Sequence, residues 1–291
     1  MNQTARTPLE EQPAGLIGFL RATYATAWLA YRGLVYQPSN LWLFAVQQWT
    51  LVWVWYFVAT FLNPVAHGAV RDEGGNYVAY VVVGVLLNQV ALSALRTPFA
   101  TISEAFWDKR LETYRLAVHG IWANLIGRLG WQVLFTSVME ALAAVFLSVI
   151  GAFGVPGPVS WPLALLVWWL LVLANAGIGL MGSSLFFLLE VKSGQDPITW
   201  VYQYLVQIVS GLYIPVAFLP GWLQRLGAVL PQTYAFSAMR LLVLAGAGPG
   251  RVAHDLLGLS VGAALSLCLG ILLTAHALRR AERESGLGVV V

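Results

Sequence analysis

Charged residues are scarce in this chain of 291 residues. Asp, Glu, Lys and Arg make up 10% of it, whereas a soluble domain carries about 25%. Apolar residues make up 59%, with 13 tryptophans among them. So few charges cannot cover the surface of a water-soluble protein, and the composition predicts an integral membrane protein.

Cysteine is almost absent, since Cys268 is the only one and lies inside an apolar run. A single cysteine excludes a disulfide within the chain and a metal site built from several thiolates. We expect Cys268 to be a small apolar side chain in the core.

Motifs that carry catalysis are lacking too. The chain contains no phosphate-binding loop of the form GxxxxGK[ST], no HExxH pair and no GxSxG turn, and its four histidines are scattered. We therefore expect no ATP site of that kind, no catalytic residue, no metal and no bound cofactor in this chain.

Long apolar stretches dominate what is present. A membrane-spanning helix needs about 20 mostly apolar residues, which predicts an all-α polytopic membrane protein. The expected spans are residues 41–62, 77–95, 129–153, 162–189, 198–214 and 256–278, within a transmembrane domain of 41–278 between an N-terminal arm of 1–40 and a tail of 279–291. This topology puts 12 of the 16 lysines and arginines on the side of both termini. The positive-inside rule then places both termini in the cytoplasm.

Residues 15–36 are apolar but include Arg21 and Arg32. On a helix, the large apolar side chains share one arc and the two arginines lie at its edge. This pattern is typical of an amphipathic helix in the membrane interface, with its arginines at the lipid headgroups. The alternative is a seventh span, which two buried arginines disfavour.

The stretch Thr101–Arg115 is the most charged part of the chain. Thr101 and Glu104 fit a capping box, which predicts that a short amphipathic cytoplasmic helix begins there. Glu104, Asp108 and Glu112 would share one face of it. This acidic face is either solvated or binds a partner that removes the repulsion between its like charges.

One acidic residue, Glu140, lies well inside a predicted span, where a carboxylate is costly. It either lines a cavity, pairs with Asn88 or Gln89 of the second span, or is a protonated structural residue. Gln203 and Gln207 lie one turn apart on the fifth span. They either form hydrogen bonds between helices or line a substrate path.

The apolar stretch 211–231 contains Pro215, Pro220 and Pro231. Proline lacks a backbone N–H and clashes with the preceding helical turn, so three prolines argue against one uninterrupted span. We predict a broken hairpin that caps the exit of a path. If the hairpin enters from outside, an external thiol reagent would reach a cysteine placed at Gln232.

Two segments match the pattern of a known family. The matching residues of the proline-rich segment are Ser210, Gly211, Pro215, Leu219, Pro220, Trp222, Leu223, Pro231, Thr233, Tyr234 and Arg240. After the second span, "KRLETYRL" keeps Leu111, Glu112 and Leu116 of the family pattern but has Lys109 and Arg110 where the family has Gly-Thr. With these residues the chain resembles the membrane (permease) subunits of type 2 ABC exporters, in the branch of bacterial drug and lipid exporters.

The resemblance implies a re-entrant outer hairpin over residues 215–240. Its characteristic residues would be Pro215, Pro220, Trp222, Pro231, Tyr234 and Arg240. A separate ABC ATPase subunit, in two copies, would bind ATP and Mg and dock on the connection after the second span and against the N-terminal helix. The residues expected to couple to it are Glu104, Asp108, Lys109, Arg110, Glu112 and Arg115.

By the same resemblance, a second permease copy, identical or closely related, completes the pore among membrane lipids, and no nucleic acid is involved. The expected function is ATP-driven export of a hydrophobic or amphipathic drug, lipid or lipid-linked molecule across a bacterial or archaeal cell membrane. The alternatives are a glycan exporter of the same class and a secondary transporter, which would need ionisable coupling residues in midspan.

Overall fold

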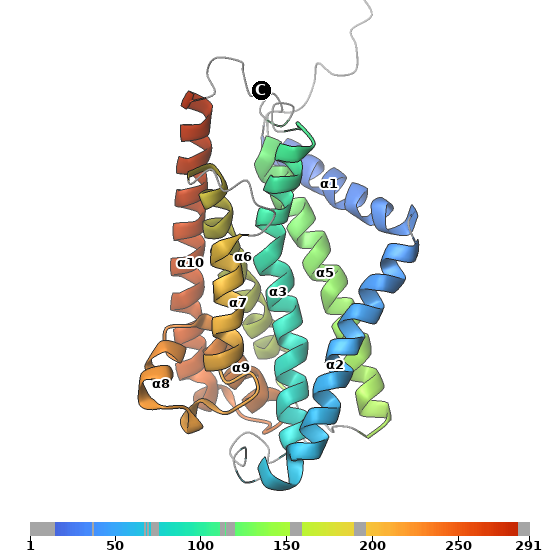
Figure 1. The fold of residues 1–291 in the computed structure, drawn as a ribbon, viewed down its shortest axis with the longest axis vertical. Helices are drawn as coiled ribbons and strands as arrows, with labels where there is room; N and C mark the ends of the chain where they lie inside the picture. The colour runs from blue at the N-terminus through green and yellow to red at the C-terminus, as the bar shows by residue number, and fades with distance from the viewer. Residues whose placement is uncertain are drawn as a thin grey trace, which may run out of the picture.

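A computed structural model of the chain describes residues 15–36, 38–66, 68, 70, 76–110, 114, 120–151, 159–188 and 196–284. Regular structure in these ranges is helical throughout (Figure 1). The helices are α1 (Leu16–Tyr36), α2 (Pro38–Ala66), α3 (Tyr77–Trp107), α5 (Gly120–Val149), α6 (Trp161–Leu188), α7 (Pro197–Val209), the 3₁₀ turn η2 (Val216–Phe218), α8 (Gly221–Gly227), α9 (Pro231–Val243) and α10 (Pro249–Glu284).

Five of these helices, namely α2, α3, α5, α6 and α10, are long and apolar enough to cross a membrane. They correspond to five of the six expected spans. α2, α3 and α10 contain the predicted stretches, whereas α5 and α6 begin before 129 and 162 and end at Val149 and Leu188, before the predicted ends at 153 and 189. The chain is therefore built as a polytopic helical membrane protein.

The sixth expected span, residues 198–214, is shorter in the structure. It forms α7, whose 13 residues extend for about 20 Å, against the roughly 30 Å of a hydrocarbon core. The helix begins where the Asp196 carboxylate accepts a hydrogen bond from the Ile198 amide (2.9 Å). It ends at Ser210, because Gly211 has a φ of +79° and turns the chain out of the helix.

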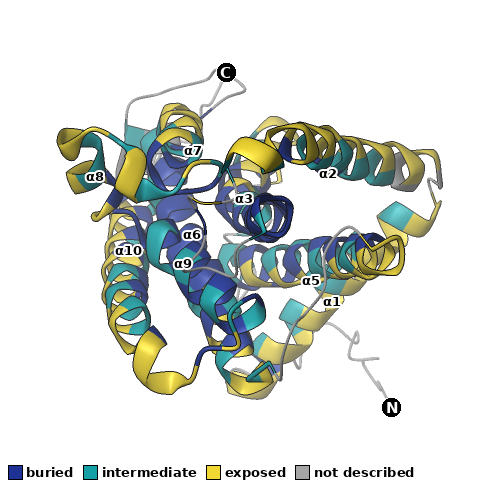
Figure 2. Cartoon of the chain, turned by 90° about the horizontal axis from the view of Figure 1, so that it is seen from below, coloured by how far each residue is buried: buried dark blue, intermediate teal, exposed yellow. Residues whose placement is uncertain are grey.

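The most buried of the five long helices is α3, which lies at the centre of the bundle (Figure 2). α6 packs between α3 and α10, and α2 and α5 lie on the other side of α3. Gly177 of α6 and Gly270 of α10 allow a close crossing, since a Cβ at either position would overlap the backbone of the other helix. Cys268, expected in the core, is exposed instead, because its face of α10 points away from α6.

The expected helix start at Thr101 is wrong. Residues 101–107 continue α3 without a break. The Thr101 hydroxyl donates to the Thr97 carbonyl oxygen (2.8 Å) and is buried, so it does not cap a new helix. The capping pattern misled because a mid-helix threonine satisfies its hydroxyl on the preceding turn equally well.

The N-terminal helix is present as expected and is α1. It crosses the bundle obliquely near the end of the molecule where α10 finishes (Figure 1). Gly127 of α5 permits the crossing, since a Cβ there would overlap Thr26. The Thr26 hydroxyl bridges the two helices by donating to the Ala123 carbonyl oxygen (3.1 Å). α1 does not belong to the five helices that are long and apolar enough to span.

Candidate functional site

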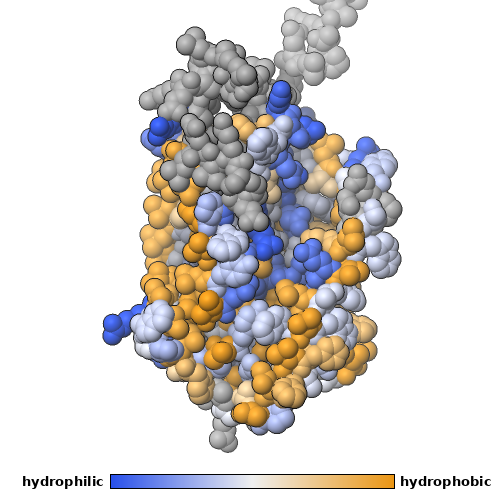
Figure 3. All heavy atoms as spheres, in the orientation of Figure 1, coloured by the Kyte–Doolittle hydropathy of each residue, from blue (hydrophilic) through white to orange (hydrophobic). Residues whose placement is uncertain are grey.

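A cavity of about 900 Å³ lies between α1, α2, α3 and α5, and Gln207 of α7 also borders it. Figure 3 shows hydrophilic residues gathered along the middle of this face of the molecule, between apolar flanks. The cavity extends to the end of the bundle that carries Glu104, Asp108, Arg110 and Arg128, which we name the charged end. The opposite end, formed by α8 and α9, is the hairpin end.

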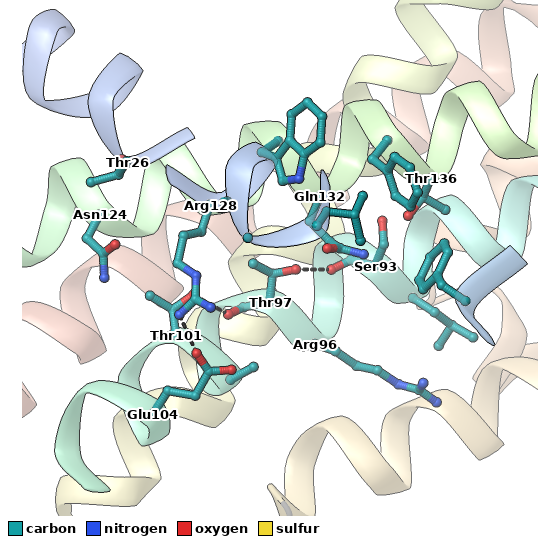
Figure 4. Close-up of a pocket in the computed structure, with 18 of the residues that line it drawn as sticks. Thr26, Ser93, Arg96, Thr97, Thr101, Glu104, Asn124, Arg128, Gln132 and Thr136 are labelled. Carbon is teal, nitrogen blue, oxygen red and sulfur yellow. Dashed lines mark hydrogen bonds and ion pairs between the residues drawn. The ribbon is translucent and has the colours of Figure 1, made fainter. Parts of the chain in front are cut away.

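The polar wall of the cavity comes from one face of α3. Gln89, Ser93, Thr97 and Thr101 are spaced so that their side chains follow one another along the helix. The hydroxyls of Ser93, Thr97 and Thr101 each donate to a carbonyl oxygen of the preceding turn (2.8, 2.6 and 2.8 Å). Their oxygens still have lone pairs that can accept hydrogen bonds inside the cavity (Figure 4).

The helices α1, α2 and α5 contribute large apolar side chains to the cavity, beside polar ones such as Gln47, Gln48 and Gln132. The large apolar side chains are Leu29, Leu34, Phe44, Leu51, Trp131 and Phe135. Phe44 of α2 and Phe135 of α5 are in contact, with ring centroids 5.1 Å apart and ring planes tilted by 48°. The cavity therefore offers both polar groups and large apolar side chains, which suits an amphipathic molecule.

The acidic residues of the charged end have partners within the chain. Arg128 of α5 forms an ion pair with Glu104 of α3 (2.6 Å), seen as a dashed line in Figure 4. Arg110 lies 3.5 Å from Asp108. The repulsion between like charges that motivated a partner for Glu104 and Asp108 is thus reduced without one.

The acidic face predicted for Glu104, Asp108 and Glu112 does not continue along one helix, because α3 ends at Trp107. α3 ends because Lys109 has a φ of 56° and the Arg110 amide donates to the Ala105 carbonyl oxygen (2.9 Å), which is the bond of a Schellman cap. A lysine is unusual at this left-handed position, so the cap could not be predicted from the residue type. Glu112 and Arg115 lie outside the described residues.

Arg96 is the third arginine of the cavity wall. Its Nε and Nη2 both donate to the side-chain oxygen of Gln203 on α7 (3.2 and 2.6 Å). The predicted path residues Gln203 and Gln207 therefore differ in role, since Gln203 binds Arg96 and Gln207 lines the cavity. Sequence reasoning counted Arg96 only as a basic flank of the connection after the second span.

Beneath the cavity, Glu140 ends a chain of polar side chains. The Gln48 amide donates to Glu140 Oε1 (3.3 Å), and the Gln89 amide donates to Gln48 Oε1 (2.7 Å). Glu140 Oε2 and the Thr136 hydroxyl are buried without a hydrogen-bond partner. Glu140 is 4% exposed and does not line the cavity itself. The expected pairing with Gln89 thus runs through Gln48, which the sequence did not single out.

The two arginines of α1 are exposed, as the interfacial pattern requires. The Arg32 guanidinium lies 5.3 Å from the centre of the Trp28 ring, within the range of a cation–π contact. Arg21 is exposed one turn from the start of the helix.

At the hairpin end, Arg240 of α9 joins both ends of the proline-rich segment to α3. Its guanidinium donates to the carbonyl oxygens of Tyr80 (3.0 Å), Gly211 (2.8 Å) and Leu212 (2.9 Å). It also lies over the Tyr80 ring at 3.4 Å, and the Tyr80 hydroxyl donates to the Gly211 carbonyl oxygen (2.6 Å). We name Arg240, Tyr80, Gly211 and Leu212 the Arg240 cluster.

Within the hairpin, the three prolines stand where they interrupt or begin short helices. Pro215 precedes η2, Pro220 precedes α8, and Pro231 is the first residue of α9, where its missing N–H costs nothing. The Tyr234 hydroxyl donates to the Ala228 carbonyl oxygen (2.7 Å) and ties α9 to the end of α8. Trp222 is 64% exposed on α8.

The hairpin reaches furthest into the bundle at Gln232. Its amide donates to the Asn175 side chain near the middle of α6, and the Tyr202 hydroxyl donates to its side-chain oxygen. Gln232 is 1% exposed, so the expectation that an external reagent would reach this position is wrong. The side chain is buried because it satisfies its hydrogen bonds on two neighbouring helices.

No metal site is suggested within the described ranges, because no three His, Cys, Asp or Glu side chains lie close enough to share an ion. Comparison of the chain with protein-family models and with curated proteins found no match. The cavity, the charged end and the Arg240 cluster are therefore the observations from which a function has to be argued.

Proposed function

We propose that the chain is the membrane-spanning permease subunit of an ATP-binding cassette exporter that moves an amphipathic or hydrophobic molecule outward. The observation that carries this proposal is the amphipathic cavity of about 900 Å³, which extends to the charged end and is closed at its other end between α2, α3 and α5, near Leu51 and Gln89. A cavity that reaches one side of a membrane and stops short of the other is what an exporter needs in its inward-facing state.

In this proposal the hairpin is re-entrant on the outer side. Gly211 and Arg240, which flank the hairpin, are joined by a hydrogen bond of 2.8 Å. The chain between them therefore begins and ends at the same depth in the bundle. Gln232 marks the deepest point, because it contacts Asn175 near the middle of α6. At Gln232 the interrupted backbone of the hairpin packs on protein, which is the condition for irregular backbone within a bilayer. α7 and the hairpin together make the fifth of six spans.

The charged end then faces the cytoplasm, together with both termini. Two copies of an ABC ATPase subunit, which carry ATP and Mg, dock there against Glu104, Asp108, Lys109 and Arg110, and against Glu112 and Arg115 beyond the described residues. α1 lies in the inner membrane interface, with Arg21 and Arg32 at the lipid headgroups. A second permease copy completes the pore in a bacterial or archaeal cell membrane.

A secondary transporter is the second candidate, and Glu140 favours it. Proton-coupled carriers use a buried ionisable residue beside the substrate path, and Glu140 has one carboxylate oxygen buried without a hydrogen-bond partner just beneath the cavity. However, Glu140 is the only ionisable side chain close to the cavity floor among the described residues of the spans. Proton coupling usually needs a second ionisable group. A glycan exporter of the ABC class shares the main proposal and differs only in substrate.

Transport in inside-out membrane vesicles tests the proposal. Vesicles from the source cells and from cells lacking this chain are compared for uptake of a fluorescent single-chain amphiphile after addition of ATP. We expect ATP-dependent uptake only in vesicles that contain the chain, blocked by vanadate and insensitive to a protonophore. Uptake that a protonophore abolishes and vanadate spares would establish the secondary transporter instead. Equal uptake with and without the chain would refute both.

A further inference from the structure

The cavity carries one positive charge, Arg96, that no acidic side chain of the described ranges balances. Glu104 is paired with Arg128 and Asp108 with Arg110, which leaves Arg96 among the charged lining residues. Among the described residues, no carboxylate lies within ion-pair distance of Arg96. Figure 4 shows its side chain extending from α3 away from the Arg128–Glu104 pair.

The partner of Arg96 is neutral. The amide oxygen of Gln203 accepts two of its hydrogen bonds but does not neutralise the guanidinium. Arg96 lies 11 residues before the last residue of α3, Trp107, or about 16 Å along the axis, so it belongs to the wall of the cavity and not to the charged end. Its side chain is exposed, so a ligand in the cavity can reach it.

The surroundings of Arg96 fit the rest of an amphiphile. Ser93 and Thr97 lie within one turn of it on α3 and Gln207 also lines the cavity, so hydrogen-bonding groups accompany the charge. Apolar side chains of α1 and α2, which include Leu34 and Phe44, give a surface for an alkyl or ring system. A guanidinium presents parallel N–H groups that match the oxygens of a carboxylate or phosphate.

We propose that the cavity selects amphiphiles with an anionic head group, and that Arg96 is the residue that binds this head. The inference rests on the proposed function for its meaning as substrate selection, but the binding itself does not require an ATPase. Glu140 does not oppose it, because its carboxylate is buried outside the cavity lining and bound by Gln48. Gln89, which lies at the floor of the cavity, is separated from Arg96 by about 10 Å along α3.

Equilibrium binding to the purified full chain in phosphatidylcholine nanodiscs tests the inference. The probes are single-chain fluorescent amphiphiles of equal tail length with phosphate monoester, carboxylate, phosphocholine or trimethylammonium heads. Their fluorescence anisotropy is titrated against nanodiscs with the chain, and empty nanodiscs give the partition background. We expect the phosphate and carboxylate probes to bind at least tenfold more tightly than the other two.

Variants at Arg96 separate recognition from general effects of charge. We expect Arg96→Gln to weaken binding of the phosphate probe at least tenfold, which corresponds to about 1.4 kcal/mol. Arg96→Lys should lose less, because it keeps the charge and only loses the paired N–H geometry, and Arg96→Glu should favour the trimethylammonium probe. Arg251→Gln, which removes an exposed arginine at the start of α10, is the matched control and should leave all affinities unchanged.

Two results would overturn the inference. One is a phosphate affinity that changes less than twofold in Arg96→Gln while the variant elutes as a monodisperse species. The other is tighter binding of the trimethylammonium probe to the unaltered chain. The proposed function fails separately, because Arg96-dependent binding of anions without any ATP-driven uptake would leave the binding site standing and remove the exporter.

Discussion

Replacement of Arg240 by alanine is the sharpest test of how the hairpin is held. Arg240 is 2% exposed and donates to three backbone carbonyl oxygens that belong to α3 and to the entrance of the hairpin. Arg240→Ala removes all three hydrogen bonds and the contact with the Tyr80 ring. The Gly211 oxygen keeps the Tyr80 hydroxyl as a donor, whereas the Leu212 oxygen loses the only side-chain donor described for it.

The expected loss of stability is large for one side chain. A hydrogen bond from a charged group contributes about 1.5–3 kcal/mol, but the three bonds share one guanidinium and one desolvation cost, so they do not add. A buried carbonyl oxygen left without a donor costs about 1–3 kcal/mol, and the cavity left by the side chain adds to this, so we expect a total loss of about 3–5 kcal/mol. For a chain of this size that corresponds to a fall in the apparent Tm on the order of 10 °C. Arg240→Lys keeps one donor and should lose roughly half as much.

Thermal unfolding in detergent, followed by intrinsic tryptophan fluorescence, measures these shifts. Gly84→Ala provides an independent perturbation, because a Cβ on Gly84 would overlap the Arg240 guanidinium while Arg240 itself is unchanged. Arg225→Ala is the matched control, since Arg225 is an exposed arginine of the same hairpin. We expect Gly84→Ala to resemble Arg240→Ala and Arg225→Ala to leave the Tm unchanged.

The reasoning is refuted if Arg240→Ala unfolds within about 2 °C of the unaltered chain. It is also refuted if Arg225→Ala lowers the Tm as much as Arg240→Ala, because any loss of positive charge would then be sufficient. A normal Tm in Gly84→Ala would show that the guanidinium can move without losing its carbonyl partners.

Three further outcomes follow from the same structure. Gly177→Ala should destabilise by several kcal/mol in a detergent unfolding assay, because its Cβ meets the α10 backbone, whereas Gly130→Ala has open space and should be neutral or slightly stabilising. Exchange of the charges of Glu104 and Arg128 should change the free energy of unfolding by less than about 1 kcal/mol, because the pair is partly exposed. A cysteine at Trp222, in a background without the native thiol, should react with an impermeant reagent from outside the cell, and labelling only after permeabilisation would contradict the proposed topology.

The positions of the long helices could be predicted from the sequence because they depend on apolar length alone. Five of the six expected spans are found as long helices, and residues 15–36 form the helix that their pattern indicated. The boundaries were harder to predict, since a helix ends where its carbonyl groups find partners. α3 continues past Thr101 and ends at Lys109, a residue that by type alone gives no reason to expect a left-handed cap.

The contacts of the site depend on which helices pack against each other. The hydrophobic periodicity of the sequence does not show which helices do so. The sequence marked Arg240 and Glu140 as notable, but not the carbonyl oxygens that Arg240 binds or the Gln48 side chain that binds Glu140. Gln48 lies on α2, and nothing in its local pattern separates it from the neighbouring Gln47. Arg96 carried no such signal, because it lies just beyond the predicted end of the second span, and its place in the cavity wall depends on the continuation of α3 to Trp107.

The uninterrupted course of α3 changes how coupling would operate in the proposed exporter. A separate connecting helix, as expected from the sequence, could move without displacing the span before it. Instead, a single helix of 31 residues, about 46 Å long, carries Glu104 near one end, Arg96 in the cavity wall, and Tyr80 in the Arg240 cluster near the other. A displacement of its charged end by an ATPase would act on Arg96 and on the support of the hairpin through the same rigid element. Substrate release and hairpin movement would then be two consequences of one helix displacement, because the Arg240 cluster fastens the hairpin directly to α3.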